Sequence, residues 1–178
     1  MENPNIYVYS FAHLDESYNG QTVFCSPKHN RLLGKIFYRK FLNEYNITFS
    51  QENTRINEDI GFNYACRMIC EHLFYQDNIV RYYEDQTPLI IWIYDKNSLT
   101  RINNHEFYYK QNEGLSANGI HAIKIAKKNK VDNKIIQKQA YEIFNALYFN
   151  YIGSINVAPQ FLEINLKGAL NFYNFYFT

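Results

Sequence analysis

The sequence carries almost no excess of charge of either sign. Lysine and arginine together number 18 and aspartate and glutamate 17, which gives a formal net charge of +1 at pH 7. A protein that binds nucleic acid through a broad basic surface shows a clear positive excess. We therefore expect no general nucleic-acid surface, and any contact with DNA or RNA is expected to be local.

Long apolar runs are also missing. No stretch approaches the roughly 18 apolar residues that a membrane-spanning helix needs. The polar start of the chain, residues 1–5, lacks the basic region of a signal peptide. We expect a soluble, cytoplasmic protein with no membrane partner.

Cysteine is scarce and odd in number. Cys25, Cys66 and Cys70 are the three present, and an odd number fits a reducing compartment. Cys66 and Cys70 stand one helical turn apart, but no close histidine completes a zinc set, and His72 is expected to point elsewhere on the same helix. Buried thiols are expected here rather than metal ligands.

Two phosphate-binding patterns are absent, the metal-holding D-x-D motif and the glycine-rich loop. Hydrophobic residues are plentiful at 47%, with Tyr 17 and Phe 14, and this composition is typical of a globular protein. Low-GC coding produces the same bias toward aromatic residues, so we do not take it as a nucleic-acid surface. At 178 residues, one domain or a domain with an appended subdomain is expected.

The spacing of apolar residues divides the chain into a strand-rich part and a helical part. Strands are expected at 6–11, 22–25, 34–38, 79–83 and 88–94, with a short helix at 39–45. A soft boundary falls near Asn112-Glu113-Gly114. We therefore expect an α/β (α+β) region at residues 1–112 and a helical C-terminal subdomain at residues 113–178.

Three helices are expected in the C-terminal part. The first covers residues 115–130, and Asp132 caps the second, which Gly153-Ser154 ends. Pro159 can open the third. The second helix has a regular apolar stripe at Ile136, Ala140, Ile143 and Leu147.

The stretch at residues 54–65 (TRINEDIGFNYA) places Glu58 and Asp59 side by side at an expected helix start. Asn57 is a plausible N-cap, and an apolar stripe follows at Phe62, Cys66, Ile69 and Leu73. Either the two carboxylates only complement the positive end of the helix dipole, worth roughly 0.3–1 kcal/mol each, or they take part in chemistry.

Segments on both sides of this motif extend the pattern. Residues 33–42 (LGKIFYRKFL) and 45–49 precede it, and residues 88–94 and 97–101 (NSLTR) follow. In order and spacing this set resembles the later half of family 2 glycosyltransferases with the GT-A fold, especially short phage-encoded members. The resemblance covers roughly residues 33–101. It implies a partial GT-A-like mixed sheet with flanking helices, ahead of the helical C-terminal part.

The resemblance also implies inverting transfer of a sugar from a nucleotide-sugar donor to a hydroxyl acceptor. Asp59 would be the general base that removes the acceptor proton, and Glu58 would support it or orient the acceptor. Ser98 and Arg101 belong to the loop that closes over the donor diphosphate, where a planar guanidinium can hold phosphate oxygens.

Three further residues receive roles from the same resemblance. Lys35 and Arg39 could meet a diphosphate or sugar, and the alternative is that both are surface cations with packed stems. His105 could be the late metal-ligating histidine. A divalent metal, Mn or Mg, is implied only for an active enzyme. The acceptor would be a glycan, a protein or a hydroxylated base in phage DNA, which is the one role left for nucleic acid.

The donor-binding half of such an enzyme, which ends in D-x-D, has no counterpart upstream of Leu33. A second polypeptide could carry it, the chain could be an inactive relative that kept a sugar-binding or scaffolding role, or its acidic loops could bind the donor differently. The main alternative to an enzyme is therefore an inactive phage interaction or structural protein. The aromatic tail at residues 171–177 either packs on the body or forms a contact surface, and an open sheet edge would favour a homo-oligomer.

Overall fold

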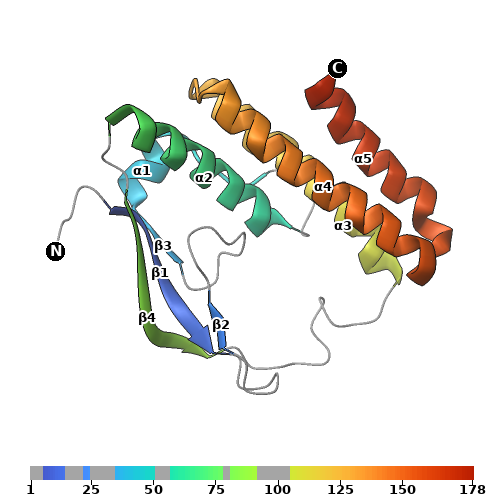
Figure 1. Ribbon diagram of the computed structural model, residues 1–178, viewed down its shortest axis with the longest axis horizontal. Helices are drawn as coiled ribbons and strands as arrows, with labels where there is room; N and C mark the ends of the chain where they lie inside the picture. Colours follow the sequence, from blue (N-terminus) through green and yellow to red (C-terminus); the bar gives the residue numbers. More distant parts are fainter. Residues whose placement is uncertain (1–5, 15–21, 25–34, 51–56, 78–80, 92–104) are drawn as a thin grey trace.

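The computed structural model describes the backbone of residues 6–14, 22–24, 35–50, 57–77, 81–91 and 105–178, and the side chains of residues 37–50, 57–73 and 111–178 (Figure 1). The strands are β1 (Ile6–Leu14), β2 (Thr22–Phe24), β3 (Lys35–Phe37) and β4 (Arg81–Ile91). The helices are α1 (Arg39–Glu44), α2 (Glu58–Asp77), α3 (His105–Lys128), α4 (Asn133–Val157) and α5 (Leu162–Phe177), with a 3-10 turn η1 (Pro159–Phe161) before α5.

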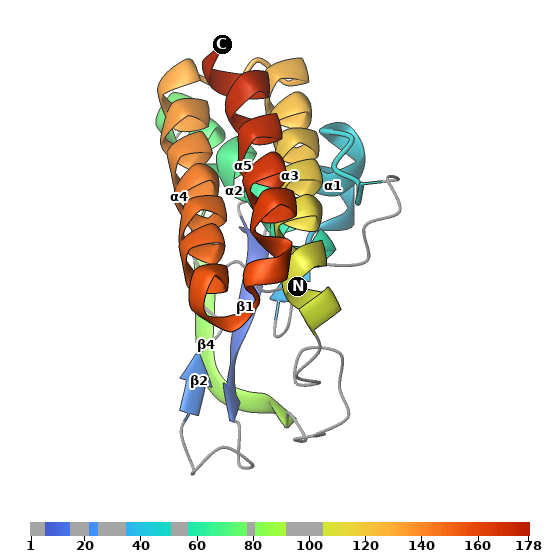
Figure 2. The same cartoon turned by 90° about the vertical axis from the view of Figure 1, so that its right-hand side faces the viewer.

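The four strands pair through β1. β2 and β3 are antiparallel to β1, and β4 is parallel to it. The described parts of the two strands expected at 79–83 and 88–94 belong to the single strand β4. In both views the strands extend away from α3, α4 and α5 (Figures 1 and 2).

The expected fold class, an α/β partial GT-A-like mixed sheet with flanking helices, is wrong. In the part of the chain whose side chains the structure describes, every regular element is helical except for Phe37, which ends β3, so the protein is mostly helical. The physical reason is that the long amphipathic segments find their apolar partners in one another. Almost all of the described core lies on α2, α3, α4 and α5, so these helices pack as a bundle and do not flank a central sheet.

α3 is the central helix of this bundle and packs against α2, α4 and α5. It runs through Asn112-Glu113-Gly114 without a break, so the expected boundary falls inside a helix. α3 and α4 are antiparallel across a short turn, in which Lys130 has a left-handed backbone (φ 56°) and the Val131 N–H donates to the Ala126 carbonyl at 3.1 Å. α4 and α5 form a second antiparallel pair (Figure 2).

Local helix signals in the C-terminal part are largely confirmed. Asp132 caps α4, and its Oδ1 accepts a hydrogen bond from the Lys134 N–H at 2.7 Å. Pro159 stands at the first position of η1, which leads into α5. The expected end of α4 at Gly153-Ser154 is wrong, because the helix continues to Val157. An exposed glycine weakens a helix by only about 1 kcal/mol, and packing on either side of it overrides that.

The expected apolar stripe of α4 is buried, and that of α2 is buried except at Leu73, which is partly buried. Ile136, Ala140, Ile143 and Leu147 of α4 are at most 1% exposed. Cys66 and Cys70 of α2 are buried, as expected.

Two helix crossings place a glycine against an asparagine of α3. Gly61 of α2 lies against Asn118, and Gly168 of α5 lies against Asn112. Asn112 is fully buried, and its Nδ2 donates to the Leu147 carbonyl of α4 at 3.0 Å and the Asn165 carbonyl of α5 at 3.1 Å. The Asn112 side chain therefore joins α3 to its antiparallel neighbour α4 and to its parallel neighbour α5.

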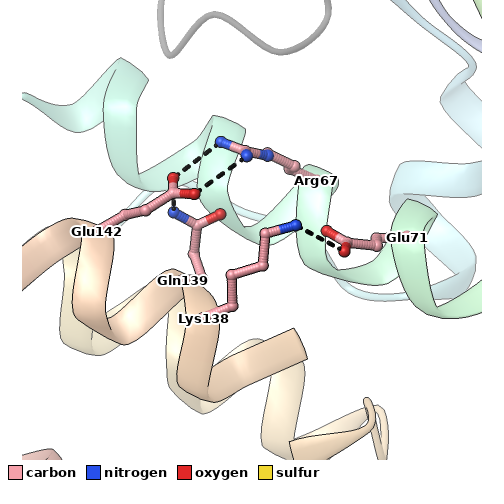
Figure 3. A network of polar contacts seen from close by, with 5 residues as sticks. All are labelled: Arg67, Glu71, Lys138, Gln139 and Glu142. Atoms are coloured by element: carbon pink, nitrogen blue, oxygen red, sulfur yellow. Dashed lines mark hydrogen bonds and ion pairs between the residues drawn. The ribbon is translucent and has the colours of Figure 1, made fainter. Parts of the chain in front are cut away.

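Charged side chains connect α2 to α4 (Figure 3). Arg67 donates to both carboxylate oxygens of Glu142, at 3.0 and 3.3 Å, and the Gln139 Nε2 donates to Glu142 at 2.9 Å. Lys138 and Glu71 form a second ion pair at 3.0 Å. A two-pronged arginine–carboxylate contact fixes orientation as well as distance, so it sets how α4 lies on α2.

Tyr64 lies next to this network, and its raised pKa predicts a loss of stability in alkali. Burial, helped by the nearby Glu142 carboxylate and opposed by the Arg67 guanidinium, raises the pKa of Tyr64 from 10.0 to about 12. The unfolded chain therefore releases this proton first, and the stability that is present below pH 10 is lost as the pH rises toward 12. At about 1.4 kcal/mol per pKa unit, the loss should reach roughly 2–3 kcal/mol.

Urea unfolding at pH 9 and near pH 12 checks this prediction. The Tyr64→Phe variant should lose less stability than the parent protein over this interval. An equal loss in both proteins would show that the alkaline sensitivity arises at other groups.

Candidate functional site

Glu58 and Asp59 do begin a helix, because they are the first two residues of α2. Glu58 is exposed and Asp59 half-buried. Asp59 Oδ1 accepts a hydrogen bond from the Ile60 N–H at 2.9 Å, and the Asp59 carbonyl accepts one from Asn63 Nδ2 at 3.0 Å. The Asp59 carboxylate thus has a structural contact within its own helical turn.

Asn57 stands immediately before α2. Its carbonyl accepts the Gly61 N–H at 3.2 Å, and its Nδ2 donates to the Gln111 carbonyl of α3 at 3.2 Å. The start of α2 is therefore held against the N-terminal part of α3. This contact explains the ordered helix start without requiring a catalytic role for the neighbouring carboxylates.

The other residues expected at an active site lie on separate elements. Lys35 begins β3, Arg39 begins α1 and is exposed, and His105 begins α3. Ser98 and Arg101 lie outside the described residues. Their catalytic, substrate-binding and metal-binding roles stay predictions.

The described residues form neither a metal cluster nor a membrane-spanning helix. Within the described residues, no group of three or more histidine, cysteine, aspartate or glutamate side chains is placed to hold a metal ion. Across the same part of the chain, no helix combines the length and apolarity needed to cross a membrane.

The most distinctive surface lies on α4 and α5. Large apolar side chains there are 39–69% exposed. We call this surface the α4–α5 face. It consists of Tyr141, Tyr148, Phe149, Ile152 and Ile155 of α4 and Leu166, Leu170 and Tyr173 of α5.

The two helices present this face from the same side of the molecule. Rings meet across the junction between them, with centroids 5.2 Å apart for Tyr141 and Phe177 and 5.7 Å apart for Phe144 and Tyr173. Because α4 and α5 are antiparallel neighbours (Figure 2), these ring contacts connect the Tyr141 end of the α4 set to the Tyr173 end of the α5 set. The face is therefore continuous across both helices.

Charge is nearly absent from this part of the sequence. Between Glu142 and the C-terminus, only Glu163 and Lys167 carry a formal charge. The outer surface of a helix pair is ordinarily lined with charged residues such as lysine and glutamate. The α3–α4 turn and the helix ends beside it show this pattern, with Lys124, Lys127, Lys128, Lys130 and Lys134. Exposed apolar patches rimmed by polar residues are typical of interaction sites.

The aromatic tail at residues 171–177 both packs on the body of the protein and contributes to an exposed surface. Phe172 is fully buried in the core, whereas Tyr173 is 42% exposed and belongs to the α4–α5 face. The α4 part of the face was not predicted from the sequence. The charge-free run at residues 143–162 was the signal that could have found it.

No family model, no curated protein and no solved structure matches this chain.

Proposed function

We propose that this chain is a non-enzymatic interaction protein, and that the α4–α5 face is the surface through which it binds an apolar helical surface of another polypeptide. The observation that carries the proposal is the continuous set of half-exposed large side chains on two adjacent helices, in a stretch with almost no charge. Burying such side chains is favourable by roughly 25 cal/mol per Å² of apolar surface.

The spacing of the exposed residues favours a helical partner. Tyr141, Tyr148, Ile152 and Ile155 follow one another at steps of seven, four and three, and Leu166, Leu170 and Tyr173 at steps of four and three. Steps of three and four place side chains in ridges along a helix. Ridges of this kind fit the grooves between the side chains of another helix.

Glycosyl transfer has less support from the same structure. The fold that the resemblance implied is not the fold of this chain, and the residues given catalytic or binding roles lie on β3, α1, α2 and α3 or outside the described residues. Asp59, the expected general base, forms a local backbone contact. The geometry therefore favours the alternative function, that of a non-enzymatic interaction protein.

Site-specific photo-crosslinking in the cells that naturally make the protein tests the proposal. A photoreactive residue is placed at Phe149, which is 69% exposed on the face, and in a control at Lys128, which is exposed on α3. The first site should give discrete adducts that mass spectrometry identifies, and the second should not. Absence of adducts from Phe149, or the same adducts from both sites, would overturn the proposal.

Calorimetric titration tests the non-enzymatic part separately. The purified chain is titrated with UDP-glucose and UDP-GlcNAc, with and without manganese. We expect no metal-dependent heat of binding. Binding of a nucleotide sugar that requires manganese would contradict the proposal and favour the transferase.

A further inference from the structure

We infer that the polypeptide bound by the α4–α5 face is a second copy of this chain, so that two molecules form a two-fold dimer in which the α4–α5 pairs meet as a four-helix layer. This inference rests on the proposed function and names its partner. Three properties of the face support it: its area, its lack of charge and its composition.

The area matches what a stable dimer needs. Taking roughly 200 Å² for a large side chain, eight side chains that are about half exposed present on the order of 700–800 Å² per molecule. A standard protein–protein interface buries about 800 Å² on each partner. The face is therefore large enough to hold two copies together without a contribution from other surfaces.

Because the face lacks charge, two copies of it can meet without electrostatic repulsion. In a two-fold interface the same patch serves on both molecules, so a charged patch would meet its own sign. Like charges brought together in this way are strongly unfavourable. Tyr148, Ile152 and Leu170 carry no charge, and the two nearby charged residues, Glu163 and Lys167, are of opposite sign. A charged partner would gain nothing from such a surface.

The composition of the face also resembles a dimer interface. Tyrosine, phenylalanine and aliphatic side chains are enriched where interfaces are buried, and lysine and glutamate are depleted. The lysine-rich α3–α4 turn lies at one end of the bundle, where Lys127 stands over the rings of Phe175 and Tyr176 at 5.3 and 5.4 Å. A helix that lies on a lipid surface instead carries lysine and arginine along its own polar side, whereas the opposite side of α4 is buried in the bundle.

Analytical ultracentrifugation of the full chain, from about 1 to about 100 micromolar, tests the inference. The parent protein should sediment as a dimer. Ile152→Glu and Leu170→Glu each place a charge within the face and should weaken the dimer at least tenfold. Asn133→Glu puts the same side chain at an exposed position of α4 outside the face, and it should leave the dimer intact.

Circular dichroism must show the same helical content for all three variants, and because Ile152 and Leu170 are both partly exposed, we expect this. A milder variant, Leu170→Ala, guards against misfolding and should weaken the dimer without adding charge. A parent chain that is monomeric at every concentration overturns the inference, and so do dimers of equal strength in the parent and both face variants. Monomers that co-float with vesicles of neutral lipid would show a membrane surface instead.

The two proposals fail in different ways. If the purified chain is monomeric but crosslinks from Phe149 to a different protein, the dimer is excluded and the interaction function stands. If the chain is monomeric and Phe149 gives no adduct, both are excluded. If the crosslinked adduct contains two copies of this chain, both are supported.

Discussion

Gly61→Ala should destabilise the protein by about 1–2 kcal/mol, although alanine is the better helix former. Gly61 lies in α2, where a methyl group on its Cα would stand 2.7 Å from Asn118 Cβ and 2.8 Å from the Asn118 carbonyl oxygen of α3. Neither atom is the free end of a flexible side chain, so the two helices would have to separate. Overpacking of a tight core contact costs typically about 1–3 kcal/mol.

The gain in helix propensity opposes this effect but is smaller. Replacing a helical glycine by alanine is worth about 0.5–1 kcal/mol where the methyl group meets nothing. Because α2 and α3 pack along their length, moving them apart would also weaken the contacts on either side of Gly61. The net result should therefore be a loss.

Gly153→Ala is the matched control. Gly153 is an exposed glycine inside α4, and no atom lies within 4 Å of the position of the added methyl group. This variant should be more stable than the parent protein by about 0.5–1 kcal/mol. Urea unfolding of both variants measures the difference, and a stabilised Gly61→Ala protein would show that the α2–α3 crossing is looser than described.

Asn112→Asp should destabilise the protein by about 3–5 kcal/mol at pH 7, the cost of a buried charge left without a partner. The substitution keeps the shape of the side chain and removes both of its N–H donors. The new carboxylate would face the Leu147 and Asn165 carbonyl oxygens in a place with no exposure to solvent. Oxygen atoms that accepted hydrogen bonds would then meet a negative charge.

The defect should shrink in acid. Burial next to carbonyl oxygens would raise the pKa of the introduced carboxyl group above its unfolded value of about 4. As the pH rises, the unfolded chain would lose this proton first. The stability of the variant relative to the parent protein would therefore be greatest below pH 4 and would fall as the pH rises above it. A protonated acid can also donate one hydrogen bond, which restores part of the contact.

Urea unfolding of the Asn112→Asp and parent proteins between pH 3.5 and pH 7 tests both the size and the sign of the effect. Asn43→Asp, at an exposed position of α1, is the control and should stay within about 0.5 kcal/mol of the parent protein. A difference between Asn112→Asp and the parent that does not depend on pH would mean that the introduced group reaches solvent.

Three signals that act within a few residues were predicted correctly, whereas the helix end at Gly153-Ser154 was not. The Asp132 cap depends on a side chain and a backbone N–H two residues apart, and Pro159 depends on its own fixed backbone angle. The start of α2 at Glu58 was also found. These features are decided locally, so no knowledge of the rest of the chain is needed to find them.

The fold class and the candidate site were not found, for different reasons. The predicted fold class was wrong because it depended on short motifs between residues 33 and 101. Most of the described core instead lies on the long helices α2, α3, α4 and α5. The site was missed because polar residues were taken as its markers. The most distinctive surface consists of Tyr, Phe, Ile and Leu side chains, which in a sequence are read as core.

The sequence by itself determined which segments of the C-terminal half are helical, where α4 and the η1 turn begin, and that Ile136, Ala140, Ile143 and Leu147 form one apolar stripe. It also shows a second set on the same helix, Tyr141, Tyr148, Ile152 and Ile155, with spacing of the same kind. Only the tertiary structure decided between them, since α3 covers the first set and leaves the second exposed. Periodicity reports that a face is apolar, and burial depends on which helix lies against it.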